Sequence, residues 1–567
     1  MSVLGAAPAP SRARHARPAQ AEKATPVVAF MLTAAPVAVI LIAQAFLSVR
    51  LLHATYASGD ESLYIYSGHQ LINELWHGGG SPYYEEWLSG APVIYPVFAG
   101  MLDHVGGLAL VRFSSCGFML IATSLLYATT RRLFGYWPAV VAAGLFAGLG
   151  ITHGLGALAT YDAMALAIMA LASYCAVKAG GGGSRWLLVI PAILLLANAT
   201  KYASILFDPV IIGLAALMLR DYGWGPIAQR VTSLGLSTSI LLVVVTLLAG
   251  SGYVHGIMFT TLSRQGGAGA VQLFGGNVVS PSQVAQDSWS LIGAVVCLGF
   301  AALVVALVLE RQSSIILLLA LLALAGTLVT LENMHLKSTT SVAKHDDFGI
   351  WFTCIAAGYA LARAAELVKY WCIRVPIIIA ALTTVVLIGH LYTYDDYVGN
   401  TRAGTQTVAL RTFEALKPYL NSHDMYLLGG LQDTEMLYDD RAPVGWYQYF
   451  DDSYIRYPVP GRGGNVRNAP GLSCGGLGQP SWGPDCIYLE GILGYQAAIH
   501  SHWFSMISMV GNHGTYQDTE ILAAIRATPG YKLISTADGG PTYIYAPDYP
   551  HQGVAVQGPA KSSASNS

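Results

Sequence analysis

The stretch Gly59-Asp60-Glu61-Ser62-Leu63-Tyr64 places two adjacent carboxylates a few residues beyond the first long apolar segment of the chain, residues 26–49. That segment is long enough to cross a bilayer as a helix, which takes about 20 apolar residues. A charge at the edge of a bilayer is costly when it has no partner, and it usually serves a function. If the chain is a membrane protein, this carboxylate pair is its first candidate site.

The composition indicates a polytopic membrane protein. Hydrophobic residues make up 54% of the 567 residues and charged residues only 11%, whereas an average soluble domain has roughly 25% charged residues. The formal net charge of −2 argues against a nucleic-acid partner, because phosphate backbones require a basic surface. No group of His, Asp and Glu has the spacing of a metal site, so no cofactor is predicted and a divalent-cation requirement stays open.

Further apolar runs bring the prediction to about eleven membrane spans. These runs are 105–129, 138–151, 160–177, 186–199, 203–219, 231–250, 289–309, 315–331, 348–362 and 375–391. Most basic residues of the short loops lie on the same side as the basic N-terminal tail, so the positive-inside rule places the N-terminus in the cytoplasm. The Asp60-Glu61 pair and everything after Leu391 then face outward.

The predicted fold class is mainly α: a helical membrane core followed by a small extracytoplasmic α/β domain. Residues 1–24 are predicted to be a disordered cytoplasmic tail, and residues 25–393 form the membrane core with its first outer loop at 50–104. The α/β domain takes residues 394–550, and residues 551–567 are predicted to be disordered because they are rich in Ser, Ala and Gln.

Local patterns predict elements within the outer regions. In the first loop, residues 62–75 have helical spacing and are expected to lie along the membrane surface. The C-terminal region is predicted to contain helices at 407–420, 495–510 and 520–527, a strand at 425–428 and a hairpin formed by 531–535 and 542–545. Cys474 and Cys486 lie in a Gly- and Pro-rich stretch, where a disulfide is plausible outside the cytoplasm.

Asp60 and Glu61 have two interpretations. At the level of lipid headgroups, a carboxylate can take a proton from an acceptor hydroxyl or amine during transfer of a group from a lipid phosphate. Alternatively, Asp60 caps the surface helix, and both acids stabilise its positive N-terminal end.

Other ionisable residues are predicted to gather at the same outer face. A lipid-phosphate donor needs cations to hold its phosphate, and the candidates are Lys201 with Tyr202, Arg264, Lys344 and His345. The alternative for the lysines is snorkelling to the headgroups. Arg112 and Asp162 fit either ligand contact or structural ion pairing between helices. Asp208, beside Pro209, is assigned no role.

Several motifs in order resemble the GT-C glycosyltransferases, nearest to the bacterial protein mannosyltransferase and aminoarabinose transferase-like group. They are Asp60-Glu61, Pro92-x-x-Tyr95-Pro96 followed by Arg112, Tyr161-Asp162, Ala199-Thr200-Lys201-Tyr202-Ala203-Ser204 and Lys344-His345-x-x-Phe348-Gly349. The resemblance covers roughly residues 26–395, and the tail is similar to the extracytoplasmic domain of actinobacterial members.

The resemblance implies a multi-pass plasma-membrane enzyme that transfers a sugar with inversion from a polyprenyl-phosphate donor to an extracytoplasmic protein, polysaccharide or lipid. It also implies Asp60 as the base, with Glu61 in support, and Lys201, Lys344 and His345 as phosphate ligands. A secondary transporter is the main alternative, but transporters tend to show inverted repeats with broken helices near the midplane. A non-catalytic protein of envelope assembly is the third interpretation.

Overall fold

The computed structural model describes most of the membrane core and part of the C-terminal region. The described residues are 26–53, 59–77, 88, 94–181, 185–249, 253–254, 256–258, 279–310, 312–339, 342–368, 370, 376, 383, 417–420, 424–428, 449–450, 456–460, 486–509, 516–536 and 541–546. The predicted disordered ends, Arg264, Cys474 and nearly all of the predicted span 375–391 lie outside these residues.

Among the described residues, six helices are long and apolar enough to cross a membrane. They are α1 (Pro26–Val49), α3 (Ile94–Phe134), α6 (Tyr161–Lys178), α9 (Trp224–Ala249), α12 (Pro281–Leu309) and α15 (Val342–Glu366). The bent pair α13 (Ser313–Ala325) and α14 (Leu328–Leu336), with an angle of 42°, makes a seventh if counted as one span. The described part therefore confirms a multi-helix membrane core, while the predicted number of eleven spans stays unconfirmed.

The other predicted spans are shorter or broken helices. The run 138–151 is divided at Leu149 into α4 (Tyr136–Gly148) and α5 (Gly150–Leu155). The run 186–199 forms α7 (Trp186–Thr200), and the run 203–219 forms the 3-10 segment η3 (Tyr202–Phe207) followed by α8 (Asp208–Leu217). The break between α7 and η3 falls at Lys201, whose extended backbone ends the helix.

Helix α15 is the centre of the bundle, and its residues from Phe348 to Ala360 are buried without exception. Two glycines allow its neighbours to approach closely. A Cβ on Gly349 would lie 2.6 Å from the backbone oxygen of Ala325 in α13, and one on Gly358 would lie 2.5 Å from that of Pro138 in α4. Small residues at such contacts are the usual basis of helix packing in membranes.

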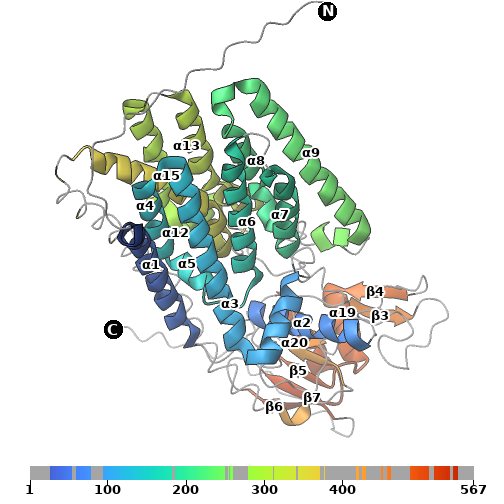
Figure 1. Ribbon diagram of the computed structural model, residues 1–567. Helices are drawn as coiled ribbons and strands as arrows, with labels where there is room; N and C mark the ends of the chain where they lie inside the picture. The colour runs from blue at the N-terminus through green and yellow to red at the C-terminus, as the bar shows by residue number, and fades with distance from the viewer. Residues whose placement is uncertain are drawn as a thin grey trace, which may run out of the picture.

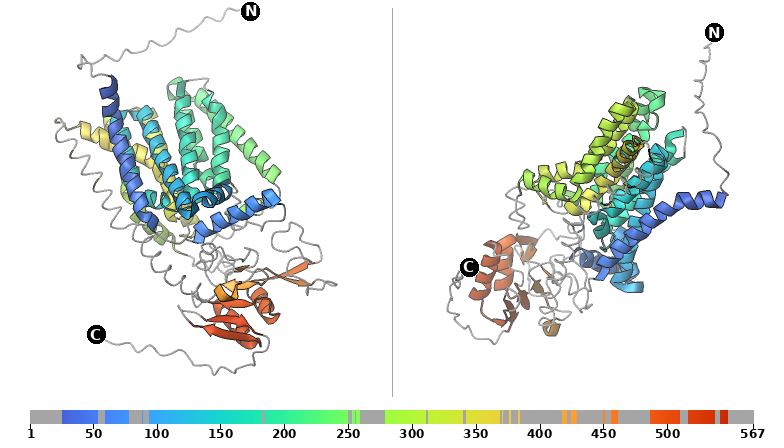
Figure 2. Two further views of the ribbon diagram at one scale, coloured as in Figure 1. Left: turned by 60° about the horizontal axis from the view of Figure 1, so that its bottom comes forward. Right: turned by 90° about the vertical axis from the view of Figure 1, so that its left-hand side faces the viewer.

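The predicted surface helix is present as α2 (Gly59–His77), which lies at one end of the bundle (Figure 1). Helix α3 is kinked at Gly106 and Gly107, and the part before the kink packs on α2. Figure 2 shows that these blue segments run across the ends of the membrane helices. His69 Nε2 of α2 lies 2.7 Å from Asp103 Oδ2 of α3, which ties the two segments together.

The C-terminal region is an α/β domain beyond the same end of the bundle as α2 (Figures 1 and 2). Its main sheet has the order β2-β1-β5-β7-β6, in which β1 is parallel to β2 and β5 and β7 is antiparallel to its neighbours. The strands are β1 (Tyr426–Leu428), β2 (Tyr449–Phe450), β5 (Met506–Ser508), β6 (Tyr531–Ser535) and β7 (Thr542–Tyr545). A two-stranded antiparallel sheet pairs β3 (Arg456–Pro460) with β4 (Cys486–Glu490), and the helices are α19 (Gly491–His500), α20 (Tyr516–Ala527) and the short η5 (Lys417–Tyr419).

The predicted hairpin and the helix at 520–527 are confirmed, but the predicted helix at 495–510 is wrong beyond residue 500. Helix α19 ends at His500, and His502 has a φ of 55°, the left-handed conformation typical of a helix end. Trp503 N donates to Ala498 O (2.9 Å) across this turn, and the chain then enters β5 at the centre of the sheet. Only residues 417–420 of the predicted helix at 407–420 are described.

Candidate active site

Asp60 and Lys344 meet at the end of the bundle that carries the C-terminal domain. Asp60 lies in the first turn of α2, and Lys344 lies in the first turn of α15, 284 residues further along the chain. Lys344 Nζ donates to Asp60 Oδ2, and the two side chains form an ion pair. The Asp60 side chain is 41% exposed and that of Lys344 19%. The fold thus brings an accessible carboxylate and an accessible cation together.

The surroundings of Asp60 favour its ionised form. Desolvation by neighbouring protein atoms raises the pKa of Asp60, but the charge and hydrogen bond of Lys344, together with the charge of Lys201, outweigh it. The pKa of Asp60 is therefore lowered from its ordinary value, although Glu61 opposes this shift. Burial, and after it the charge of Asp60, raises the pKa of the nearby Tyr64 well above its ordinary value, so Tyr64 remains a neutral phenol.

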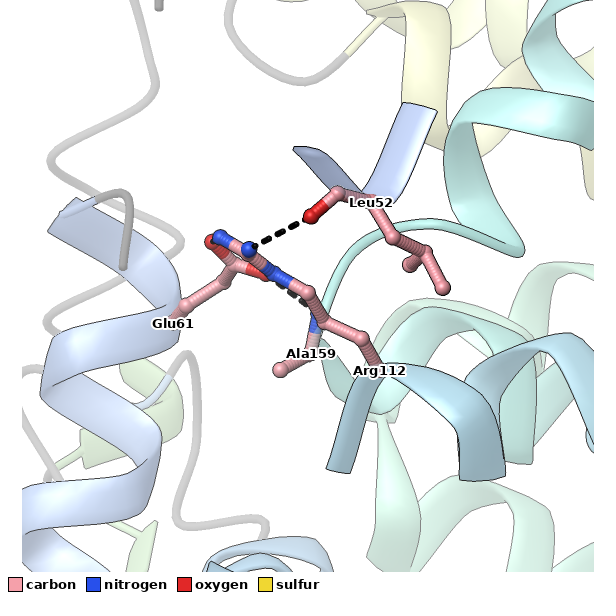
Figure 3. A network of polar contacts seen from close by, with 4 residues as sticks. All are labelled: Leu52, Glu61, Arg112 and Ala159. Atoms are coloured by element: carbon pink, nitrogen blue, oxygen red, sulfur yellow. Dashed lines mark hydrogen bonds and ion pairs between the residues drawn. The ribbon is translucent and has the colours of Figure 1, made fainter. Parts of the chain in front are cut away.

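Glu61, the neighbour of Asp60, has different surroundings. Arg112 Nε donates to Glu61 Oε1 (2.8 Å) and Arg112 Nη2 to Oε2 (2.8 Å), a bidentate pair, and Ala159 N also donates to Oε1 (2.7 Å). Arg112 Nη1 in addition donates to the backbone oxygen of Leu52 (3.4 Å), as Figure 3 shows. The Glu61 side chain is 0% exposed and that of Arg112 2%. Glu61 therefore fastens the start of α2 to α3 and to the segment before α6, and Arg112 links this contact to η1 (Arg50–His53).

Lys201 is also buried and paired. Its Nζ donates to Asp162 Oδ1 in the first turn of α6 and lies 4.7 Å from the centroid of the Tyr161 ring. The side chains of Lys201 and Asp162 are 3% and 1% exposed. The sequence left two alternatives open for Arg112 and Asp162, and the structure has both in ion pairs between segments, Arg112 with Glu61 and Asp162 with Lys201. Asp162 Oδ2, also buried, accepts no hydrogen bond within the described residues.

A network of hydrogen bonds stabilises the interruption between α7 and η3, at which Lys201 lies. Asn198 Nδ2 donates to Asp208 Oδ2 (2.9 Å), and Ser204 Oγ donates to Asn198 Oδ1 (2.6 Å). Ser204 N donates to the backbone oxygen of Lys201 (3.0 Å). All three network side chains are buried. Asp208 has no role in the sequence-based prediction, because its partner Asn198 lies inside an apolar run that offers no signal of a polar contact.

The remaining candidates are placed less directly. His345 is buried on α15 next to Lys344, and Asp347 two residues further accepts from Thr152 Oγ1 (2.9 Å) of α5. Tyr202 begins η3 immediately after Lys201. Arg264 is outside the described residues, and so is Cys474, while Cys486 begins β4. In the described part, no group of three or more His, Cys, Asp or Glu side chains has an arrangement that would hold a metal ion.

The described structure is a helical membrane core with charged side chains gathered at the end next to an α/β domain. Residues 98–249 match the family model of the dolichyl-phosphate-mannose-protein mannosyltransferases. No curated protein matches the chain.

The structure is similar to that of ArnT from Cupriavidus metallidurans in the apo state, with 14% identity and a TM-score of 0.53 over 92% of this chain and 99% of that one. It is also similar to the oligosaccharyltransferase AglB from Archaeoglobus fulgidus in complex with an inhibitory peptide and a dolichol-phosphate, with 11% identity and a TM-score of 0.50 over 91% of this chain and 75% of that one. The chain is thus a membrane protein with the GT-C fold of membrane glycosyltransferases.

Proposed function

We propose that the chain transfers a sugar from a polyprenyl-phosphate donor to an extracytoplasmic acceptor, with inversion and with Asp60 as the base. The contact between Asp60 and Lys344 carries this proposal, because it puts an accessible carboxylate beside a cation at the end of the membrane core. In this proposal, this end of the core lies at the lipid headgroups, where an acceptor and a lipid phosphate both have access. A base and a phosphate-binding cation are what such a transfer requires.

In the proposed reaction, Asp60 takes the proton of an acceptor hydroxyl or amine as its oxygen or nitrogen bonds to the anomeric carbon. The bond from that carbon to the phosphate oxygen breaks on the opposite face, so the configuration inverts without a covalent intermediate. Lys344 stabilises the phosphate that leaves, and Lys201 adds positive charge near the site. A phosphate is a good leaving group, and no general acid is needed.

The other predicted site residues take supporting roles. Glu61 and Arg112 position Asp60 by fixing the first turn of α2, and Asp162 positions Lys201. Tyr202 and His345 adjoin the two lysines in the sequence and remain donor-binding candidates, as does Arg264.

The donor class is supported by AglB, which has this fold and was solved with a dolichol-phosphate and a peptide. The described part of the α/β domain lies at the same end of the bundle as α2, whose first turn carries Asp60 (Figure 1), and we infer that this domain, predicted at 394–550, presents the acceptor to the base. We place that end outside the plasma membrane and the N-terminus in the cytoplasm, as the basic residues of the loops indicate. The acceptor is a protein, a polysaccharide or a lipid.

The test is sugar transfer by the purified protein in liposomes that contain polyprenyl-phosphate-linked sugars. Asp60→Asn removes the base at constant shape, and transfer is expected to fall at least about a hundredfold, the lower range for loss of a general base. Asp287→Asn, in α12, is the matched control for loss of one carboxylate near the start of a membrane helix. Wild-type turnover by the Asp60→Asn protein would remove Asp60 from the role of base.

A further inference from the structure

We propose that Lys344 has two partners in turn: it neutralises Asp60 while the donor is absent, and it passes to the donor phosphate when the donor binds. This exchange rests on the function proposed above. It makes the base dependent on the donor, so that Asp60 becomes a better proton acceptor only when a sugar is in place to be transferred.

The exposure of the ion pairs singles out Lys344. The pairs of Arg112 with Glu61 and of Lys201 with Asp162 join side chains that are at most 3% exposed. Removing one partner from such a buried pair leaves a charge without water, which costs several kcal/mol in a typical protein. In the pair of Lys344 with Asp60 the side chains are 19% and 41% exposed, and an ion pair that water reaches costs less to separate than a fully buried one. Lys344 is therefore the cation of this site that changes partner at the lowest cost.

The charges around Asp60 determine what the exchange does. Lys344 faces it from α15 and Lys201 from the end of α7, while Glu61 and Tyr64 are its neighbours on α2. A lipid phosphodiester brings one negative charge, which competes with one carboxylate for one ammonium group. Lys201 remains with Asp162. When Lys344 turns to the phosphate, Asp60 loses the largest influence that lowers its pKa, so its affinity for a proton rises.

The form of the lysine side chain suits this role. An ammonium group has three donors on a flexible stem of four carbons, and it binds a carboxylate or a phosphate as a point charge. An arginine, whose planar group binds in fixed pairs, is used instead at Glu61, where the contact must stay in place.

The probe is methyl farnesyl phosphate, a lipid phosphodiester with one fixed negative charge, and farnesol is the control without phosphate. Binding to the full-length protein in detergent is measured by calorimetry for wild type, Asp60→Asn, Lys344→Gln and the double variant. Thermal unfolding of each variant checks that it is folded, and Lys344→Arg provides a second test if Lys344→Gln is not.

The exchange predicts that Asp60→Asn binds the probe about twofold to fivefold more tightly than wild type, because the competitor for Lys344 is gone. Lys344→Gln weakens binding about tenfold or more, the size of a charge-assisted hydrogen bond. In the Lys344→Gln background, Asp60→Asn gives no gain. Lys344→Arg retains binding of the probe.

Equal gains from Asp60→Asn in both backgrounds would overturn the exchange, because they would report simple repulsion between Asp60 and the phosphate. Unchanged binding by Lys344→Gln would also overturn it and leave the proposed function standing. If wild type binds the probe no better than farnesol, the proposed donor class fails and the exchange fails with it.

Discussion

Replacing Glu61 by Gln tests whether the buried pair with Arg112 holds Asp60, the proposed base, in place. The side chains of Glu61 and Arg112 are 0% and 2% exposed, so the Glu61→Gln change would remove the carboxylate that the buried guanidinium binds with two hydrogen bonds. Removing one partner of such a pair costs about 3–5 kcal/mol. The same helix offers a matched control in His69, which is 34% exposed in its pair with Asp103. Because glutamine keeps an N–H donor for the buried Asp103, His69→Gln is expected to cost about 1 kcal/mol, the size of a single hydrogen bond.

The assay is the free energy of unfolding in detergent micelles, measured by denaturant titration for Glu61→Gln, Arg112→Met, their double variant and His69→Gln. The double variant has neither charge, so it should lose clearly less stability than the two single losses added together. Sugar transfer, measured in parallel, should fall in both single variants, because the first turn of α2 carries Asp60. The reasoning is refuted if Glu61→Gln is no less stable than His69→Gln, or if the losses simply add.

Three further predictions concern the same end of the bundle. Lys344→Gln should move the acid limb of the kcat/KM profile for sugar transfer to higher pH. The proposed base Asp60 accepts a proton only when it is deprotonated, and Lys344 lowers its pKa. Without Lys344, activity is therefore lost at a higher pH as the solution is acidified. Gly100→Ala should lose about 1–3 kcal/mol of stability in the denaturant titration, because its Cβ would lie 2.8 Å from Gly68 C. Gly117→Ala in the same helix is the control and should lose none, because its Cβ would meet nothing within 4 Å. Asn198→Leu should raise KM for the lipid donor more than it lowers kcat, because it removes two hydrogen bonds that position the segment carrying Lys201. Steady-state kinetics with varied donor measure both constants, and an unchanged KM would contradict this prediction.

The convergence of charges at one end of the bundle is predictable from the sequence, because it needs only the spans and their order. Once apolar runs determine the predicted spans, Asp60 follows the first, Asp162 begins another and Lys344 lies just before the run 348–362. The pairing among them is not predictable in the same way. Whether Arg112 contacts Glu61 or Asp162 depends on how far each helix is rotated about its axis, and packing of the whole core sets that rotation.

The lengths of the spans were the weaker part of the sequence interpretation for a related reason. An apolar run shows that a segment avoids water, but it does not show where the helix is interrupted. The run 138–151 is broken at Leu149, whose extended backbone separates α4 from α5. In the C-terminal domain, the left-handed residue His502 ends α19 although apolar side chains continue in a helical pattern. In both places the break is set by the backbone conformation of a single residue, which the pattern of apolar residues does not reveal.

The adjacent acids Asp60 and Glu61 illustrate why a two-residue motif can contain two unlike functions. Successive residues of a helix point about 100° apart, so a single helix presents one carboxylate to the core and the next to its edge. Glu61 reaches Arg112 and Ala159 in the core, where three hydrogen bonds and complete burial make its charge a fixed part of the structure. Asp60, one position earlier, pairs with an accessible lysine. The cost of desolvation thus separates a carboxylate that must keep its partner from one that is able to exchange it, and a base has to be the second kind.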